Sequence, residues 1–478
     1  MNGREKGYED RMTLSDIQRL LGELDTHPTR SLGQNFLHDQ NLARSIVALL
    51  DIQPGDHVVE IGPGLGALTE FLDTPEIRLT LIEKDSRLIP HLKAKFEHGT
   101  NRVFHADALD FDLRELWGHG PVKVIGNLPY YISTPLIAKY ASALSPASAL
   151  VLTLQLELAQ RLGAAHDTSD YGAMTLCTGR RWDIRLERKL PASVFFPRPK
   201  VDSAVITLRR KPRARVRAID DSIFESLVRR GFSERRKQLR NMLPEFKNDW
   251  EKITTALGVL PTIRAEQLSP AQWESLAFTA SPATAQHGAE RFDVVDEKDR
   301  VLRSEFRDVI HVNNLRHRAV HMLLFNAAGD LYLQKRSIWK DRNPGLWDSS
   351  AAGHVDSGED YLTAARRELQ EELGIEAPHL HPVTRLTPNE SNGWEFIQAY
   401  HGHHEGPFQP ATMEVETGAF FSLNKIRHWA ASNPADFSPV FLEILKDIPH
   451  SPNQETILGS NLELLKERAS KDGFLGGI

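Results

Sequence analysis

The chain of 478 residues contains a single cysteine, Cys177. One thiol cannot form a disulfide within the chain, and it excludes a zinc or iron–sulfur site built from several cysteines of one chain. No apolar run approaches the roughly 18 residues that a membrane-spanning helix requires. The first residues, MNGREKGYED, are charged and lack the apolar core of a secretory signal. We therefore expect a cytoplasmic protein without a membrane partner.

The average composition hides an uneven distribution of charge. Hydrophobic residues make up 40% and charged residues 26%, which is typical of globular proteins and excludes a collagen-like or largely disordered chain. Residues 180–240 contain 19 Lys and Arg against 7 Asp and Glu, a balance of +12. Because the whole chain carries −6, the remainder carries −18. Such a basic segment indicates either a polyanion-binding site or a solvated helix surface.

The pattern of apolar residues divides the chain into parts of different type. Six short β-rich runs alternate with helical stretches before residue 210, which predicts βαβ units and a mainly parallel sheet. Helical spacing follows, and then a second β-rich pattern with a hairpin at Gly329-Asp330. We expect a helical arm (1–30), an α/β domain (31–210), a helical domain (211–280), a linker (281–290), a second β-rich domain (291–450) and a polar tail (451–478).

Glycines and polar residues follow the expected strands of the α/β domain. A strand at 58–61 runs into the glycine-rich turn 62–66, where missing side chains let a ligand approach the backbone. The next strand ends in Glu83, about 20 residues on, where doubly wound folds place a carboxylate for ribose hydroxyls. Two later strands lead to Asp107 and Asn127. Because open α/β sheets bind ligands at these strand ends, the sequence predicts a nucleotide-type cofactor site.

This ordered series of motifs resembles the ribosomal RNA adenine dimethyltransferases, and among them the small-subunit (16S) dimethyladenosine transferases. The likeness covers about residues 12–280 and rests on SLGQNFL, EIGPGLG, LIEKD, HADAL, GNLPYYIS and FFPRPKVDSAV. It implies a Rossmann-like methyltransferase with a small helical domain, S-adenosylmethionine as cofactor, and two neighbouring adenines of 16S rRNA in the small ribosomal subunit as target. The matching cofactor-binding positions are Asn35, Leu37, Gly62, Glu83, Asp107 and Asn127.

The residues Asn127 to Tyr130 suit methyl transfer to adenine. The amino group of adenine is a poor nucleophile, because its lone pair is delocalised into the ring. Asn127 can accept a hydrogen bond from this amine through its side-chain carbonyl, and Leu128 or Pro129 can do so through a backbone carbonyl. Tyr130 can stack on a base that is splayed out of the RNA. We therefore expect Asn127, Pro129 and Tyr130 to be catalytic.

The basic segment then has an expected partner, because phosphate contacts dominate affinity for nucleic acids. Its cations are expected on one helical segment, SLVRRGFSERRKQLRNML, where they would bind rRNA. The predicted RNA-binding residues are Arg229, Arg230, Arg235, Arg236, Lys237 and Arg240.

A second patterned segment combines an apolar helical stripe with three carboxylates at i, i+3 and i+4, namely Glu368, Glu371 and Glu372. Packed carboxylates repel one another unless a hard cation binds. The cluster therefore indicates Mg²⁺ or Mn²⁺ and, through it, a diphosphate-containing small molecule, with a solvated acidic helix face as the alternative. Gly374 is placed to end the helix in a left-handed conformation.

The full spacing of residues 353–375 resembles the Nudix box at every fixed position. This resemblance implies an α+β Nudix fold over about residues 290–445 and Mg²⁺ or Mn²⁺ bound by the three glutamates. Of these, Glu371 and Glu372 are expected to be catalytic. By the same likeness Arg367 orients the cluster and Glu359 supports it, while Glu414 or Glu416 is a weaker candidate for a further acid.

The flanks of the box resemble the Nudix branch that also contains isopentenyl-diphosphate isomerases. Those isomerases use a Cys before the box together with a Glu, for which Glu395 is the candidate here. The corresponding loop offers only Ser349 and Ser350, and a hydroxyl is a much weaker acid than a thiol. We expect metal-dependent hydrolysis of a diphosphate-linked substrate and no isomerisation.

Three alternatives remain open at this stage. The first part could methylate large-subunit rRNA, as resistance methylases of the same fold do. It could act mainly as a ribosome-assembly factor. The second part could be a binding module with a vestigial Nudix box.

Overall fold

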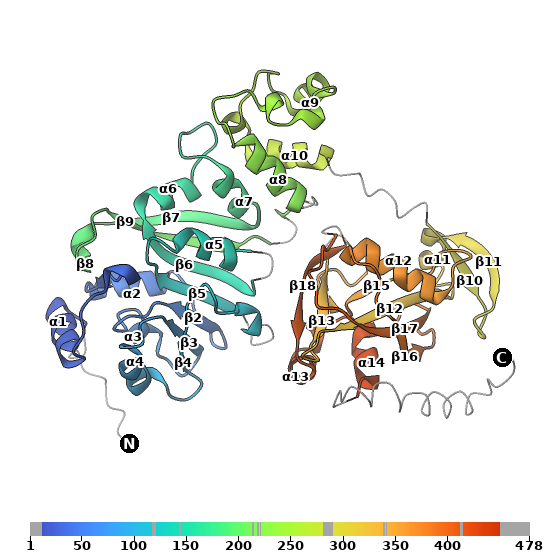
Figure 1. The fold of residues 1–478 in the computed structure, drawn as a ribbon, viewed down its shortest axis with the longest axis horizontal. Helices are drawn as coiled ribbons and strands as arrows, with labels where there is room; N and C mark the ends of the chain where they lie inside the picture. The colour runs from blue at the N-terminus through green and yellow to red at the C-terminus, as the bar shows by residue number, and fades with distance from the viewer. Residues whose placement is uncertain are drawn as a thin grey trace. The chain divides into compact units, whose positions relative to one another are not determined.

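The computed structural model describes residues 12–449 except 117–120, 143–144, 213–214, 218, 220, 281–289, 338–339, 341 and 412–413. It divides into two compact units, residues 1–217 with 223–277 and residues 278–478 with 218–222 (Figure 1). The expected tail and all but residue 290 of the expected linker lie outside the described residues. Within the described ranges, no helix has both the length and the apolar character needed to cross a bilayer.

The first unit contains a seven-stranded sheet in the order β4-β3-β2-β5-β6-β9-β7. Its strands are β2 (His57–Ile61), β3 (Arg78–Glu83), β4 (Arg102–His105), β5 (Val122–Asn127), β6 (Ala147–Gln155), β7 (Trp182–Leu190) and β9 (Ser203–Arg210). The neighbouring strands β4, β3, β2, β5 and β6 are parallel, whereas β9 and β7 pair as antiparallel strands at one edge of the sheet. The six predicted β-rich runs are six of these strands, which confirms the doubly wound α/β expectation.

Helices cover both faces of this sheet, because alternate residues of each strand point to opposite sides. On β2, Val58 packs into one apolar core, and Val59 and Ile61 pack into the other. The first core contains residues of α1 (Leu14–Glu23), α2 (Gln40–Ala48), α3 (Thr69–Leu72) and α4 (Ile89–Phe96). The second contains residues of α5 (Ser133–Tyr140), α6 (Leu156–Leu162) and α7 (Ala173–Arg181). A short pair, β1 (Phe36–Leu37) and β8 (Phe195–Phe196), joins two distant loops.

The helical part of this unit contains α8 (Asp221–Gly231), α9 (Trp250–Leu257) and α10 (Pro270–Ala280). The single helix expected through the basic cluster is wrong, because α8 ends at Gly231 and residues 232–236 form turns. A Cβ at Gly231 would lie 2.4 Å from the Trp273 ring, so this close approach requires glycine. The Ser233 hydroxyl also donates to the Arg230 carbonyl at 2.7 Å, which helps to end the helix.

The second unit contains a mixed seven-stranded sheet in which β14-β13-β12-β17-β16 are neighbours, β15 pairs with β12, and β18 pairs with β13. Its strands are β12 (His317–Phe325), β13 (Leu331–Arg336), β14 (Trp347–Asp348), β15 (Ala351–His354), β16 (His381–Leu386), β17 (Glu395–His403) and β18 (Val415–Phe421). The predicted hairpin is confirmed, since β12 and β13 pair as antiparallel strands. A separate hairpin, β10 (Arg291–Val295) with β11 (Val301–Phe306), precedes α11 (Arg307–Val312).

The carboxylate-rich segment forms α12 (Tyr361–Leu373), which begins at the capping residue Asp360. Its apolar stripe, including Ala365, Leu369 and Leu373, packs on β12 and β15. Gly374 ends the helix with φ of 65°, so the predicted left-handed cap is confirmed. Two further helices, α13 (Leu423–Ser432) and α14 (Pro439–Asp447), complete the unit.

Candidate functional sites

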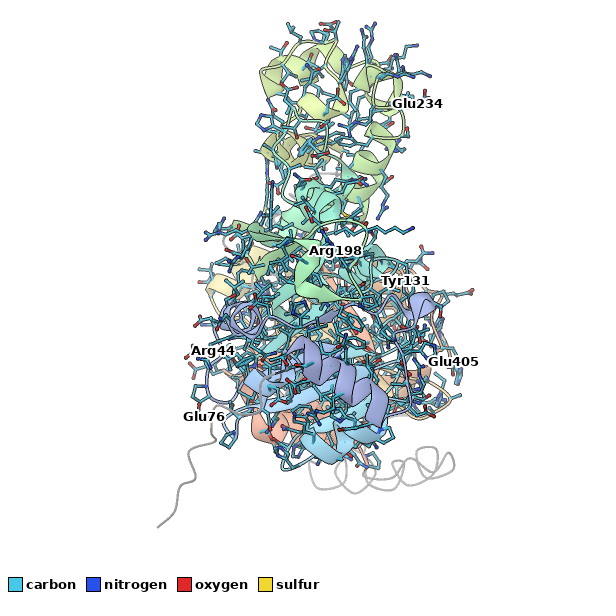
Figure 2. All side chains as sticks on the ribbon, turned by 90° about the vertical axis from the view of Figure 1, so that its left-hand side faces the viewer. Arg44, Glu76, Tyr131, Arg198, Glu234 and Glu405 are labelled. Carbon is cyan, nitrogen blue, oxygen red and sulfur yellow. The ribbon has the colours of Figure 1, made fainter. Side chains whose placement is uncertain are left out.

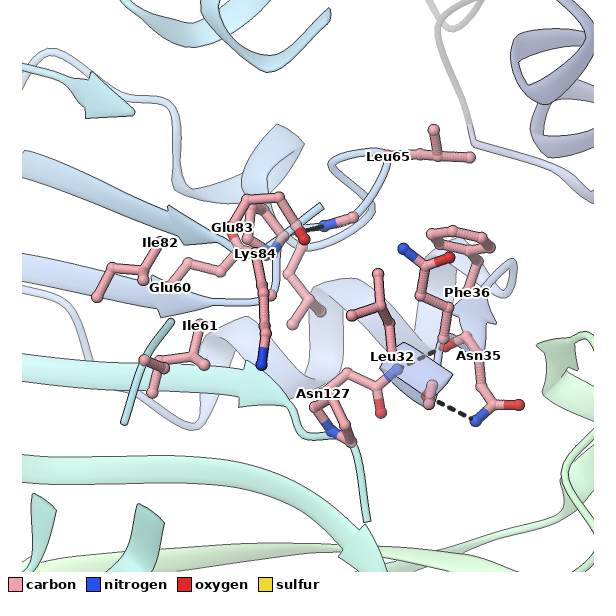
Figure 3. A pocket seen from close by; sticks show the side chains of 18 of the residues that line it. Leu32, Asn35, Phe36, Glu60, Ile61, Leu65, Ile82, Glu83, Lys84 and Asn127 are labelled. Atoms are coloured by element: carbon pink, nitrogen blue, oxygen red, sulfur yellow. Dashed lines mark hydrogen bonds between the residues drawn. The ribbon is translucent and has the colours of Figure 1, made fainter. Parts of the chain in front are cut away.

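A cavity opens at the carboxyl ends of β2, β3 and β5 in the first unit (Figure 3). The space inside it, counted together with its open mouth, is about 900 Å³. All six residues predicted to bind the cofactor line it: Asn35, Leu37, Gly62, Glu83, Asp107 and Asn127. These six residues come from five separate stretches of the chain and meet at one edge of the sheet.

The glycine-rich turn gives this cavity an open backbone wall. Gly62 and Gly64 have φ of 65° and 59°, a conformation that favours glycine. A Cβ at Gly64 would lie 2.9 Å from the Phe36 ring, so glycine is needed there for packing. At Gly62 no atom of the described residues other than its two chain neighbours lies within 4 Å of the Cβ position, which leaves its backbone accessible to a ligand.

Two buried carboxyl groups lie beside this turn. Glu83 accepts backbone hydrogen bonds from Gly64 at 3.1 Å and Asp85 at 2.7 Å, and burial raises its pKa despite these amides. Burial raises the pKa of Glu60 to about 8, although Thr69 donates to it at 2.7 Å. Sequence reasoning missed Glu60, because a carboxyl group inside a strand carries no signal that it faces a cavity.

Asp107 lies at the rim with both carboxylate oxygens engaged. It pairs with Lys84 at 2.6 Å and accepts a hydrogen bond from the Leu109 amide at 2.9 Å. Burial acts to raise its pKa, but these hydrogen bonds and the Lys84 charge outweigh burial and lower it. Lys84 also lines the cavity and was not predicted from the sequence.

Asn127 is held in one orientation by the loop that precedes β1. Its Nδ2 donates to the Asn35 backbone carbonyl at 2.8 Å, and Asn35 Nδ2 donates to the Gly33 carbonyl at 3.1 Å (Figure 3). Asn127 Oδ1 accepts no hydrogen bond from the described residues, so this oxygen remains available to a donor.

The other two residues predicted to be catalytic are placed differently. Pro129 lines the cavity, but its carbonyl already accepts hydrogen bonds from the Ile132 amide at 3.1 Å and the Ser133 hydroxyl at 3.2 Å. Tyr130 is not among the lining residues, and its hydroxyl lies 2.7 Å from Ser203 Oγ. The adjacent Tyr131 lines the cavity and is 54% exposed.

In the second unit, Arg367 gathers the carboxylates of α12. Its guanidinium contacts Glu359 at 3.0 Å, Glu368 at 2.8 Å and Glu371 at 3.1 Å, and it donates to the His354 carbonyl at 2.9 Å. Glu368 and Glu371 therefore share the face on which the orienting arginine lies, whereas the ion pair of Glu372 within the described residues is with Lys340.

The two inner glutamates of α12 lie in different environments. Burial and the neighbouring Glu372 raise the pKa of Glu368 to about 8. A Cβ at Gly353 would overlap the Glu368 carboxylate at 1.9 Å, which explains the glycine at the start of the box. Glu372 is 1% exposed and accepts hydrogen bonds from Gln334 at 3.0 Å and the Ala352 amide at 3.1 Å.

The further acids have cationic neighbours. Lys340 lies 3.7 Å from Glu372 and also pairs with Glu414, so Glu414 lies near the cluster. Glu416 instead lies 3.9 Å from Lys335. Neither lysine was singled out from the sequence.

The residues considered for isomerase chemistry are buried, and each of them has a hydrogen-bond or ion-pair partner. Ser349 Oγ lies 2.7 Å from His321 Nδ1, and the Ser350 hydroxyl donates to the Tyr332 carbonyl at 2.6 Å. Glu395 lies 3.3 Å from Arg342 and 3.5 Å from both His317 and His354.

Comparison with known proteins identifies both units. The family model for ribosomal RNA adenine dimethylases matches residues 27–280. The chain belongs to this family. A ribosomal RNA small subunit methyltransferase A of Geobacillus kaustophilus is 38% identical, covering 58% of this chain and 98% of the relative. That of Alkaliphilus metalliredigens is 42% identical over 45% of this chain and 77% of the relative.

The second unit carries a NUDIX domain, whose family model matches residues 315–441. This match and the dimethylase match confirm the resemblances drawn from the motifs. Among solved structures, a dimethyladenosine transferase from Plasmodium falciparum is 24% identical and covers 51% of this chain and 98% of its own, with a TM-score of 0.42.

In this dimethylase the predicted RNA-binding cations form two groups, and Glu234 marks their segment in Figure 2. Most are paired locally: Arg229 with Glu225, Arg230 with Glu245, Lys237 with Glu234, and Arg235 with Glu266. Arg235 also donates to the Ser169 carbonyl at 2.8 Å, so it helps to hold a neighbouring loop. Arg236 and Arg240 are exposed, and neither has an ion-pair partner within the described part of the chain.

Proposed function

We propose that this dimethylase transfers methyl groups from S-adenosylmethionine to the amino groups of two neighbouring adenines in 16S rRNA of the small ribosomal subunit. The observation that carries the proposal is Asn127, whose Oδ1 is free to accept while Nδ2 is bound to Asn35. The relatives that the chain spans almost completely act, by their names, on small-subunit rRNA. An rRNA substrate places the enzyme in the cytoplasm.

The cavity suits S-adenosylmethionine in shape and polarity. The open backbone at Gly62 admits the methionine part of the cofactor close to the turn. Glu83 has lone pairs left for ribose hydroxyls beyond its two amide bonds, and the rim residue Asp107 suits the adenine amine. Asn35 and Leu37 contribute the wall from the opposite loop. When bound, the cofactor supplies an activated methyl group on a sulfonium, so the protein's task is positioning.

The target adenine would be bound by Asn127 and the residues after it. Asn127 Oδ1 accepts a hydrogen bond from the adenine amine, which draws the lone pair out of the ring and toward the methyl group. The Leu128 carbonyl is the better second acceptor, because the Pro129 carbonyl already accepts two hydrogen bonds. Tyr130 then stacks on the flipped base, with its hydroxyl anchored to Ser203.

The test is a methylation assay with unmethylated small subunits, and in parallel with large subunits, followed by mapping of the modified bases. We expect two neighbouring dimethyladenines in the small-subunit RNA and none with the folded Asn127→Ala variant. Modification of large subunits alone would favour the alternative target. Ribosome binding without methylation would favour an assembly factor.

RNA docking is assigned to the basic turn after α8. Arg236 and Arg240 are the strongest candidates, because they are exposed and not committed to carboxylates. Arg229, Arg230 and Lys237 remain candidates whose existing ion pairs must be exchanged for phosphates.

For the NUDIX domain we propose Mg²⁺-dependent hydrolysis of a diphosphate-linked substrate. The observation that carries it is the position of Glu368, which is buried beside Glu372 and Glu371: burial first, and then these neighbouring carboxylates, raise the Glu368 pKa to about 8. Glu368, Glu371 and Glu372 would hold Mg²⁺ or Mn²⁺, which supplies charge neutralisation for the diphosphate. Arg367 holds Glu368 and Glu371 together, and Glu359 holds Arg367 in turn.

The hydrolase is tested with Mg²⁺, a panel of nucleoside diphosphate derivatives and isopentenyl diphosphate. We expect hydrolysis of at least one panel member by the full chain, lost in Glu372→Gln. Formation of dimethylallyl diphosphate would overturn the argument from the missing thiol. If no compound of the panel is hydrolysed or isomerised, the NUDIX domain is a binding module with a vestigial box.

A further inference from the structure

Strand β11 has one edge that no other strand covers in the described part of the chain. It pairs on its other side with β10, and these two strands form a sheet of their own at the margin of the second unit (Figure 1). β10 is the inner strand of the two, because the Ser357 amide donates to its Arg291 carbonyl at 2.8 Å. The open edge of β11 therefore presents backbone donors and acceptors to a further strand.

The hydrogen-bonding pattern determines which residues of β11 face this open edge. The Arg307 amide donates to the Glu290 carbonyl at 2.9 Å, directly beside the paired residues of β10 and β11. Backbone groups of successive strand residues point in opposite directions along the sheet. Ser304 and Phe306 therefore direct their amides away from β10, toward the open edge.

Apolar side chains of β11 and α11 are exposed near this edge. Val301 is 51% exposed and Leu302 is 60% exposed. Phe306, at the end of β11, is also exposed, as are Val309 and Val312 on α11. Exposed apolar side chains that gather in one region of a surface indicate an interaction site.

The two charged side chains of β11 have opposite signs and lie close together, with Arg303 Nε 3.5 Å from Glu305 Oε1. They flank Ser304, and Leu302 and Phe306 flank them in turn, so this segment is self-complementary. If a second β11 lies antiparallel with the two Ser304 residues opposite each other, Arg303 lies opposite Glu305. Leu302 then lies opposite Phe306. A two-fold axis at Arg303 or at Glu305 would instead place like charges directly opposite each other, which is destabilising.

We propose that β11 pairs with β11 of a second copy of this chain, antiparallel about a two-fold axis at Ser304, so that two hairpins form one four-stranded sheet. The Ser304 carbonyl accepts a hydrogen bond from the Arg291 side chain at 3.2 Å and keeps a second lone pair for the other copy's amide. Leu302 is the extra residue of a β-bulge opposite β10, so we assign it a side-chain contact only. Because both copies use the same surface, the assembly closes as a dimer.

The experiment measures the mass of the full chain by sedimentation equilibrium over a range of concentrations. We expect a dimer of the wild type. Arg303→Glu and Glu305→Arg should each raise the Kd of the dimer about tenfold, because each substitution places like charges opposite each other. The double variant Arg303→Glu/Glu305→Arg exchanges the two charges and should restore the dimer. Lys446→Glu, at an exposed position on α14, is the matched control and should leave the Kd unchanged.

Cysteine cross-linking tests the register of the pairing. In a Cys177→Ser background, Ser304→Cys should link two copies on mild oxidation, because Cα atoms of a hydrogen-bonded antiparallel pair lie about 5.5 Å apart, within disulfide reach. Lys446→Cys in the same background should not link them.

Several results would overturn the proposal. These are a monomeric wild type, a dimer whose Kd is unchanged in Arg303→Glu, a double variant that is folded by circular dichroism yet monomeric, and no cross-link through Ser304→Cys. Each readout is the state of assembly, so none depends on the proposed methyl transfer or hydrolysis.

Discussion

The cavity of the first unit and the carboxylate cluster of α12 prepare for their ligands by opposite means. In the cavity, each polar group is already oriented by backbone or side-chain partners, as Asn127 is by Asn35. Around α12, the ion pairs of Glu359, Glu368, Glu371 and Glu372 within the described residues are with Arg367 or Lys340. We infer that the first site depends on hydrogen-bond geometry, whereas the second depends on charge balance.

We expect the largest effect on activity from a substitution that removes the oriented hydrogen-bond acceptor of the first site. Asn127→Ala should lower methyl transfer by about 10²–10³-fold, by analogy with the loss of one oriented hydrogen-bond partner at other active sites. Cofactor affinity should change less, because five other predicted residues still line the cavity. Initial rates on small subunits and calorimetric cofactor binding provide the measurements. Near-normal turnover in a folded variant would contradict the assignment.

We expect the next largest effect from a substitution in the carboxylate cluster that removes one negative charge but keeps the size of the side chain. Glu372→Gln should lower Mg²⁺-dependent hydrolysis by on the order of 10²-fold, because one metal ligand is lost from the cluster. The matched control is Glu416→Gln, which changes an acid paired with Lys335 rather than with the cluster. Equal losses in both variants would mean that the effect is not specific to the metal site.

The charge-balance interpretation also predicts a pH dependence. The pKa of Glu368 is raised from 4.5 to about 8, so the protonated form prevails at neutral pH without metal. Since Mg²⁺ binds the deprotonated form, its affinity should fall about tenfold per pH unit below pH 8. Titrations of Mg²⁺ from pH 6 to 9 test this. Affinity independent of pH would show that Glu368 is already ionised.

The smallest effect concerns RNA docking. The double variant Arg236→Gln/Arg240→Gln should reduce the salt dependence of RNA binding by about one unit of log–log slope per lost phosphate contact. Arg235→Gln is the contrasting variant, because its guanidinium bonds to the Ser169 carbonyl and should affect thermal stability more than slope. An unchanged slope in the double variant would identify the basic turn as a solvated surface.

Features carried by neighbouring residues could be predicted from the sequence, whereas features that depend on distant packing could not. The ligand-binding residues at the ends of β2, β3 and β5 could be predicted, because the carboxyl ends of parallel strands lie at the same edge of a sheet. Strand β7 was missed since its exposed middle is charged, a property that also protects a sheet edge from aggregation. The end of α8 depends on Trp273, which lies far along the chain from Gly231.

The same distinction holds within the second unit. The spacing of the box predicted both the shared face of its glutamates and the cap at Gly374. The 3.5 Å approach of His317 to Glu395 was not predicted, because it depends on the parallel pairing of β12 with β17. Sequence spacing cannot indicate which strands will become neighbours in a mixed sheet.

The central claim is that one chain carries two catalytic sites, each dependent on its own residues. The most direct test assays wild type, Asn127→Ala and Glu372→Gln in parallel, for dimethyladenine in small subunits and for Mg²⁺-dependent diphosphate hydrolysis. We predict that Asn127→Ala loses only methylation and Glu372→Gln loses only hydrolysis. Wild-type protein that leaves small subunits unmethylated, or a folded variant that loses both activities, would contradict the account.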